Sequence, residues 1–222
     1  MKKIYINPGH SDQDPGAVGF ETERRLNVAV SKYMEAYLLA NYACETRMNP
    51  GTMLALSEVC KDANSWGADL FVSVHFNAGG GDGFECYVYS QNRVALGEVF
   101  AKYVKDIGQN LRYPDTTGMP MGVKLRPGLY VLKNTQMPAV LCEGAFVDDE
   151  KDICDWNDNF ALQKLGEAYA KAAAEFLSLE KKAQLKYYVY FTGTMGPFSE
   201  EKTARSLLGV LQAAGCTGEV TQ

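Results

Sequence analysis

The chain has 222 residues, of which 46% are apolar, and it carries a net charge of -5. This length and composition allow one sizeable domain with a hydrophobic core, plus a small appendage. The acidic balance gives no basic field that would attract nucleic acid or an anionic membrane, so we expect no nucleic-acid partner.

The N-terminal stretch Met1–Pro8 has two lysines but too short an apolar run for a secretory signal. No run approaches the roughly 18 apolar residues of a membrane span, so we expect no membrane insertion. The protein is therefore expected to be made in the cytoplasm without a signal peptide. The six cysteines form no C-x-x-C pair, which favours reduced core thiols over disulfides or a cysteine-based zinc site.

Three strand-like apolar runs each lead to a residue that can bind a metal or move a proton. The first passes through a Pro-Gly turn to His10, the second runs straight into His75, and the third straight into Glu143. Ligands of open α/β sheets bind outside the carboxyl ends of parallel strands. If these strands are parallel neighbours, the three side chains converge on one crevice.

Segments with apolar residues at i, i+3 and i+4 alternate with the strand-like runs, and this spacing predicts helices. The predicted helices are residues 23–41, 52–66, 94–111 and 160–179. Further strands are predicted at residues 43–47, 84–89 and 129–132. The alternation predicts an α/β fold with three layers: a mostly parallel central sheet with helices on both faces.

Two loops are expected near the crevice. Residues 78–83 form a flexible, glycine-rich loop, and residues 112–127 form a long loop of the kind that is often functional inside a compact domain. The strand between them, residues 84–89, alternates apolar and polar side chains and is predicted to be half exposed, with Glu85 on its polar side.

The two histidines of the chain suggest a metal site, although a lone histidine is more often structural. A catalytic zinc needs three protein ligands and one open position, and two histidines with one glutamate are an established set. Glu23 can supply the third ligand if the first helix begins over the crevice. Glu21 is the rival ligand, and a solvated charge at the helix start is the commonest fate of such a glutamate. Asp14 is expected to cap its turn rather than bind metal.

In this arrangement the zinc would lower the pKa of a bound water and polarise the scissile carbonyl. Glu143 would accept the proton of the water and pass it to the leaving nitrogen. A carboxylate directly after an apolar strand is costly to bury unless it is used or paired, which favours a functional role for Glu143.

Five motifs, in this order, resemble the zinc-dependent N-acetylmuramoyl-L-alanine amidases called Amidase_3. They are NPGH (7–10), DPGA (14–17), ERRLN (23–27), SVHFNA (73–78) and MPAVLCEGAF (137–146). The resemblance covers roughly residues 1–179 and implies one Zn2+ per chain, held by His10, Glu23 and His75, with Glu143 as catalytic acid/base. It also implies cleavage of the amide between the lactyl group of N-acetylmuramic acid and L-alanine of the peptidoglycan stem peptide.

The sequence departs from the family pattern at three places without removing a ligand. Asn7 replaces a usual aspartate, Gly144-Ala145 replaces a small residue followed by glycine, and Met121 stands where an arginine often precedes Gly-Val-Lys. The last change leaves the substrate contacts of that loop open.

Charged residues 180–182 mark a boundary between a zinc amidase catalytic domain at residues 1–180 and a small C-terminal β-α segment at residues 186–222. The segment resembles the first half of a sporulation-related (SPOR) repeat, which binds peptidoglycan. A docking strand, or a strand that forms a homodimer, is the alternative, because the segment is too small to fold alone.

Together these features predict a hydrolase that degrades the cell wall, either a phage endolysin or a mother-cell lytic enzyme, with peptidoglycan as its partner. Such an enzyme acts on the wall only after its release from the cytoplasm. Two alternatives are a zinc carboxypeptidase that cuts stem peptides and a non-catalytic peptidoglycan-binding module. The presence of His10, His75 and Glu143 argues against the non-catalytic module.

Overall fold

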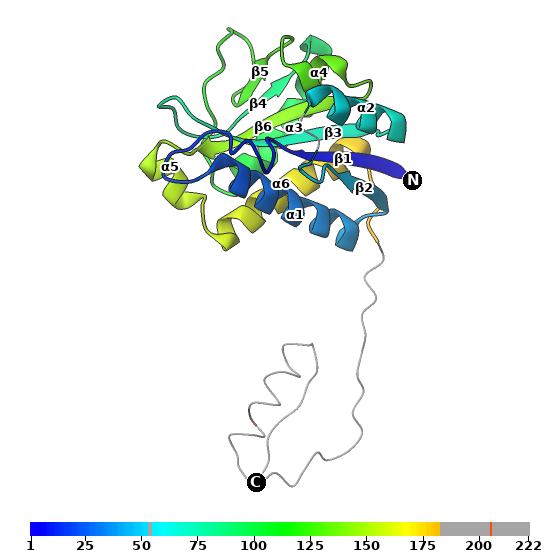
Figure 1. Ribbon diagram of the computed structural model, residues 1–222, viewed down its shortest axis with the longest axis horizontal. Coiled ribbons are helices and arrows are strands. Elements are labelled where there is room, and N and C mark those ends of the chain that lie inside the picture. Colours follow the sequence, from blue (N-terminus) through cyan, green and yellow to red (C-terminus); the bar gives the residue numbers. More distant parts are fainter. Residues whose placement is uncertain (53–54, 183–204, 206–222) are drawn as a thin grey trace. The chain divides into compact units, whose positions relative to one another are not determined.

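A computed structural model describes residues 1–52, 55–182 and 205 (Figure 1). The chain divides into two compact units, Met1–Lys182 and Ala183–Gln222. The predicted C-terminal β-α segment at residues 186–222 lies outside the described residues, apart from residue 205.

A six-stranded sheet with the strand order β2-β1-β3-β6-β4-β5 forms the centre of the first unit. The strands are β1 (Lys2–Pro8), β2 (Cys44–Met48), β3 (Leu70–Asn77), β4 (Glu85–Val88), β5 (Val123–Leu125) and β6 (Ala139–Phe146). Strands β2, β1, β3 and β6 are parallel to one another, whereas β4 runs antiparallel to β6 and parallel to β5. The prediction of a mostly parallel sheet is confirmed.

Helices cover both faces of this sheet (Figure 1). On one face lie α1 (Glu23–Asn41), α3 (Val94–Asp106) and α6 (Asn159–Leu177), and on the other lie α2 (Leu56–Trp66) and α4 (Tyr130–Asn134). The short helices η1 (Gln91–Arg93) and α5 (Glu150–Asp155) complete the described elements. The three-layer prediction is therefore confirmed.

The buried strands are apolar on both faces because each face has a helical layer to pack against. Ile4 and Val72 contribute to the core under α1, α3 and α6. Their neighbours Tyr5 and Phe71 point to the opposite face, where their rings stack 5.5 Å apart in the smaller core under α2 and α4. This alternation follows from the two-residue period of a strand.

One predicted strand is wrong: residues 129–132 fall largely in the helix α4, not in the sheet. Val131 and Leu132 are buried there, so the apolar run packs into the core as a helical turn instead of a strand. A run this short does not distinguish a strand from one turn of helix. The third predicted helix is also too long, because α3 ends at Asp106 and Gly108 adopts a φ of 102°.

The described residues include the helices given above and five of the six cysteines. None of the helices in that part of the chain has both the length and the apolar character to cross a membrane. The described cysteines are free thiols, and Cys154 is exposed whereas Cys44, Cys60, Cys86 and Cys142 are buried. The expected core position thus holds for these four.

Candidate metal centre

The carboxyl ends of β1, β3 and β6 lie side by side because the three strands are parallel neighbours. His75 on β3 and Glu143 on β6 are register partners, so their side chains leave the same face of the sheet. After β1 the chain turns through Gly9 to His10, which has the left-handed φ of 65°. The ring centroids of His10 and His75 are 5.2 Å apart.

Glu23, at the first turn of α1, lies between the two histidines. Its Oε2 is 2.9 Å from Nε2 of His10, and its Oε1 is 2.8 Å from Nδ1 of His75. His10, Glu23 and His75 each offer one candidate ligand atom, and these three atoms all lie within 4.8 Å of one another. Glu21, the rival from the sequence, instead forms an ion pair with Arg25 at 2.7 Å.

Two glycines allow the backbone to close around this cluster. A Cβ on Gly9 would lie 2.1 Å from the ring of His75, and a Cβ on Gly16 would lie 2.5 Å from Oε2 of Glu23. Gly16 also has a φ of 69°, which side chains other than glycine rarely tolerate. The loop between β1 and α1 is thus shaped to bring its backbone against the three polar side chains.

Further contacts orient His10 and Glu23. Asp14 accepts a hydrogen bond from the backbone N–H of Gly16 at 3.1 Å, as expected of a turn cap, but its other oxygen lies 2.8 Å from Nδ1 of His10. Asn27 donates to Oε1 of Glu23, and the backbone N–H of Ala17 donates to Oε2. A carboxylate behind a histidine fixes which ring nitrogen faces a metal, so Asp14 suits this supporting role.

The electrostatics of the cluster favour a cation. The hydrogen bond with Glu23 raises the pKa of His10 to about 9, although burial opposes this rise, and Asp14 contributes further. Burial alone would raise the pKa of Glu23, but the hydrogen bonds from His10 and His75 hold it well below its usual range. The carboxylate is therefore ionised at neutral pH and attracts positive charge into the crevice.

Glu143 has a different environment on the neighbouring strand. Its Oε2 is buried and has no hydrogen-bond partner among the residues that the structure describes. Burial raises the pKa of Glu143 well above its usual value, and the charges of Glu23 and Glu85 add to the rise. A carboxyl group that holds a proton this readily can accept one and deliver it during a reaction.

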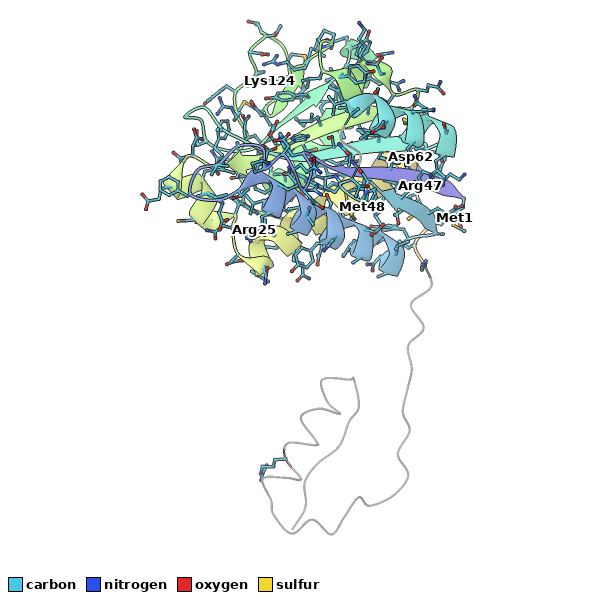
Figure 2. The ribbon with its side chains drawn as sticks, viewed as in Figure 1. Met1, Arg25, Arg47, Met48, Asp62 and Lys124 are labelled. Carbon is cyan, nitrogen blue, oxygen red and sulfur yellow. The ribbon has the colours of Figure 1, made fainter. Side chains whose placement is uncertain are left out.

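Glu85 was expected on a half-exposed strand face, but it is buried. Its Oε2 accepts a hydrogen bond from Nζ of Lys124 and lies 2.9 Å from Nε of Arg112. Its Oε1 accepts from Tyr87 at 2.6 Å and from Asn77 at 2.8 Å. We call Glu85, Lys124 and Arg112 the cationic cluster; Lys124 lies on the β4–β5 side of the sheet (Figure 2).

The glycine-rich loop at residues 78–83 is held by acidic side chains that follow β6. Asp148 accepts hydrogen bonds from the backbone N–H groups of Gly79 and Gly80, and Asp152 accepts one from Gly83 at 2.8 Å. Asp152 also accepts from the backbone N–H of Phe146, at the end of β6. These contacts tie the loop to the strand that carries Glu143.

Comparisons with known proteins show which family the chain belongs to. The N-acetylmuramoyl-L-alanine amidase family Amidase_3 matches residues 4–175. The chain belongs to this family. Its predicted fold, family and enzyme class, a hydrolase of the N-acetylmuramoyl-L-alanine amidase type, are thereby confirmed.

Several relatives extend over most of the amidase chain. The N-acetylmuramoyl-L-alanine amidase CwlM of Bacillus licheniformis is 32% identical over 220 residues, which cover 97% of this chain and 83% of CwlM. The endolysin of Bacillus phage SPP1 is 31% identical over 82% of this chain and 68% of its own length. The catalytic domain of CwlV from Bacillus (Paenibacillus) polymyxa has a TM-score of 0.72 and 28% identity, covering 81% of this chain and 100% of that domain.

Proposed function

We propose that this amidase hydrolyses the bond between N-acetylmuramic acid and L-alanine in peptidoglycan, using one zinc ion held by His10, Glu23 and His75. The observation that carries the proposal is the position of the Glu23 carboxylate between the two imidazoles, with all three candidate ligand atoms within 4.8 Å. Glu143, on the next strand of the sheet, acts as the general acid/base.

The residues present fit a zinc ion by several criteria. Two imidazole nitrogens and one carboxylate oxygen form a donor set that zinc accepts, and three protein ligands leave a position open for the reacting groups. Gly9 and Gly16 provide a cradle that a Cβ would fill, and Glu143 has a buried oxygen without a partner among the described residues. When bound, zinc supplies a Lewis acid for the carbonyl and lowers the pKa of water.

The side chains of this protein then have distinct tasks. Glu143 accepts a proton from the attacking water as the oxygen adds to the lactyl carbonyl carbon. It delivers that proton to the amide nitrogen as the carbon–nitrogen bond breaks, so the products are a lactyl carboxylate and the free amine of L-alanine. The raised pKa of Glu143 brings its proton affinity closer to that of both partners, which favours each transfer. Asp14 keeps Nε2 of His10 directed into the site.

Product analysis of a muramyl peptide tests the reaction directly. The purified protein should release a new L-alanine amine from muramyl-L-alanyl peptides, and a chelator should abolish this release until zinc is restored. The zinc carboxypeptidase alternative predicts release of the C-terminal residue of the stem peptide and an intact muramyl-alanine bond. That product pattern would contradict the proposal.

We further propose that the amidase domain occupies residues 1–180 and that residues 186–222 bind the wall or another copy of the chain. The alignment with CwlM covers 97% of this chain and supports a role for this segment, because it extends beyond the catalytic region. Replacing Tyr188 and Tyr190 by Ser in the full chain should weaken sedimentation with insoluble walls, or the self-association measured by ultracentrifugation. Hydrolysis of soluble muramyl peptides should remain unchanged.

Cell-wall lysis after release from the cytoplasm is the proposed setting of this activity. The resemblance to the endolysin of phage SPP1 and to the sporulation-specific amidase of Bacillus subtilis supports it. The latter is 28% identical over 97% of this chain and 82% of its own length. Expression in a bacterial host should leave cells intact until the inner membrane is permeabilised, and lysis without permeabilisation would contradict the setting.

A further inference from the structure

The cationic cluster lies directly beside Glu143 on the sheet. Glu143 is the register partner of His75 on one side and of Glu85 on the other, so the three side chains form a row on one face. Tyr87, two residues after Glu85, is in register with Lys124 of β5, which therefore shares that face. The cluster thus continues the row of the proposed active site in the direction away from the metal.

The charges of this cluster do not cancel. Burial would raise the pKa of Glu85, but the hydrogen bonds from Lys124 and Tyr87 hold it below its usual value, so Glu85 is ionised. One carboxylate therefore faces the two cations Lys124 and Arg112, which leaves one excess positive charge. The nearby cation Arg126 is compensated separately by Asp115 at 2.6 Å.

Arg112 is the member of the cluster that reaches solvent: its side chain is 28% exposed, against 9% for Lys124. Its guanidinium lies over the ring of Phe146, 4.5 Å from the centroid, and Nη1 donates to the carbonyl of Asp82 at 3.4 Å. Its backbone N–H donates to the carbonyl of Phe84. Arg112 is therefore held in one orientation.

The remaining nitrogen of the guanidinium, Nη2, makes no hydrogen bond with the described part of the chain, whereas Nη1 donates to the carbonyl of Asp82 and Nε lies against Glu85. An oriented guanidinium with a free edge is well suited to bind a carboxylate. An ammonium group on a flexible stem would lack this fixed geometry. With its side chain 28% exposed, Arg112 can therefore offer Nη2 to a substrate as a hydrogen-bond donor.

The distance between strands and the distance between peptide residues indicate which substrate group can reach Arg112. Neighbouring strands lie about 4.8 Å apart, and successive residues of a peptide are about 3.8 Å apart. A stem peptide that has its scissile amide at Glu143 and runs along this row places the residue after L-alanine beside the cluster. In peptidoglycan that residue is a D-glutamate linked through its side chain, and its α-carboxyl group is either free or amidated.

We propose that Arg112, supported by Glu85 and Lys124, binds the free α-carboxylate of the residue that follows the scissile L-alanine. This subsite makes the enzyme selective for stem peptides whose second residue carries a free carboxylate over those in which it is amidated. The inference rests on the proposed amidase function, since it concerns the same substrate.

Two soluble substrates that differ in a single group test the subsite: muramyl-L-alanyl-D-glutamate and muramyl-L-alanyl-D-isoglutamine. For the wild-type protein we expect kcat/KM to be about tenfold higher on the acid, the lower end of the effect of a charge-assisted hydrogen bond. In Arg112→Met this preference should vanish, because kcat/KM should fall on muramyl-L-alanyl-D-glutamate but not on the isoglutamine substrate. Arg126→Met is the matched control: it removes the same charge from a pair outside the cluster and should keep the preference.

Equal wild-type kcat/KM on the two substrates would overturn the subsite. A fall of the same size on both substrates in Arg112→Met would also overturn it, because Arg112 would then only support Glu85. If Arg112→Met does not fold, the wild-type preference should still decline as salt is raised, since salt screens an exposed ion pair; a preference independent of salt would contradict the proposal. Absence of amine release from both substrates would instead refute the amidase function itself.

Discussion

The proposed active site holds a buried carboxylate at each end, Glu23 of α1 beside His75 and Glu85 of β4 on the other side of Glu143, and the two have different partners. Glu23 lies between the imidazoles of His10 and His75, whereas Glu85 lies against Lys124 and Arg112. Imidazole nitrogens can lose a proton and bind a metal, whereas ammonium and guanidinium groups remain charged and only donate hydrogen bonds. This difference supports the proposals that one end binds a cation and the other binds an anion.

Glu143 lies between these two ends and has neither kind of partner. Its buried Oε2 is unpaired among the described residues, and burial together with the charges of Glu23 and Glu85 raises its pKa. The contrast supports the proposal that each of the three carboxylates has a different task, with Glu23 as metal ligand, Glu85 as the group that orients the cations, and Glu143 as the group that transfers the proton. The variants below test this division.

The largest effect is expected from Glu23→Gln. The variant keeps the size of the side chain but removes the charge that joins the two histidines, so the zinc should be lost and kcat should fall by about 10^4-fold or more. Metal analysis and amine release measure the two effects. Glu21→Gln is the matched control: it removes the same charge two residues away, from a side chain paired with Arg25, and should keep both metal and activity.

A somewhat smaller loss is expected from Glu143→Gln. Removing a general acid/base lowers kcat by about 10^3-fold, and the zinc ligands are untouched, so the metal should be retained. Thermal unfolding provides the control, because the unpaired carboxyl should be replaced by an amide without loss of stability. Full hydrolysis by Glu143→Gln would contradict its assigned role.

Glu85→Gln should act on stability. The variant leaves Lys124 and Arg112 without their shared carboxylate, which should cost about 3 kcal/mol of unfolding free energy, measured by denaturant titration. The double variant with Lys124→Met should recover part of this loss. If Glu85→Gln alone is as stable as the wild type, the ion pairs of Glu85 with Lys124 and Arg112 do not stabilise the fold.

The lowered pKa of Glu85 predicts that the stability of the protein depends on pH. Folding lowers the pKa of Glu85 from its ordinary value of 4.5, so its contribution to stability is present above that pH. The contribution is lost as the pH falls through the lower pKa of the folded state. The stability of the wild type should therefore decline more steeply below about pH 4.5 than that of Glu85→Gln.

The smallest effect is expected from Asp14→Asn. The amide still caps the turn but no longer holds the orientation and charge of His10, so zinc affinity should fall about 10- to 100-fold. Competition with a chromophoric chelator measures this. Asp12→Asn, which alters an exposed partner of Arg24, should leave the zinc affinity unchanged.

The convergence of His10, His75 and Glu143 could be predicted from the sequence because each follows an apolar strand and parallel strands end at one edge. The choice between Glu21 and Glu23 could not be made in this way. It depends on the angle at which α1 enters over the sheet, and that angle is set by packing of α1 against α6 rather than by any local pattern.

The role of Glu85 could not be predicted either, because alternation along β4 does not reveal what covers the polar face. The hydrogen bond to Lys124 spans 39 positions of the sequence, and its formation depends on the pairing of β4 with β5. One available signal was the segment 112–127, which was predicted to be a long functional loop and which supplies both cations. The loop prediction is wrong for its last part, because residues 123–125 form strand β5 beside β4. The helix α4 was missed because a single turn carries too little periodicity.

Zinc titration of the metal-stripped protein tests the central claim most directly. We predict that wild type and Glu143→Gln each bind one zinc ion per chain, that Glu23→Gln and His75→Ala do not, and that only wild type regains amine release. A wild-type chain that binds no zinc, or a Glu23→Gln chain that binds it equally well, would contradict the account.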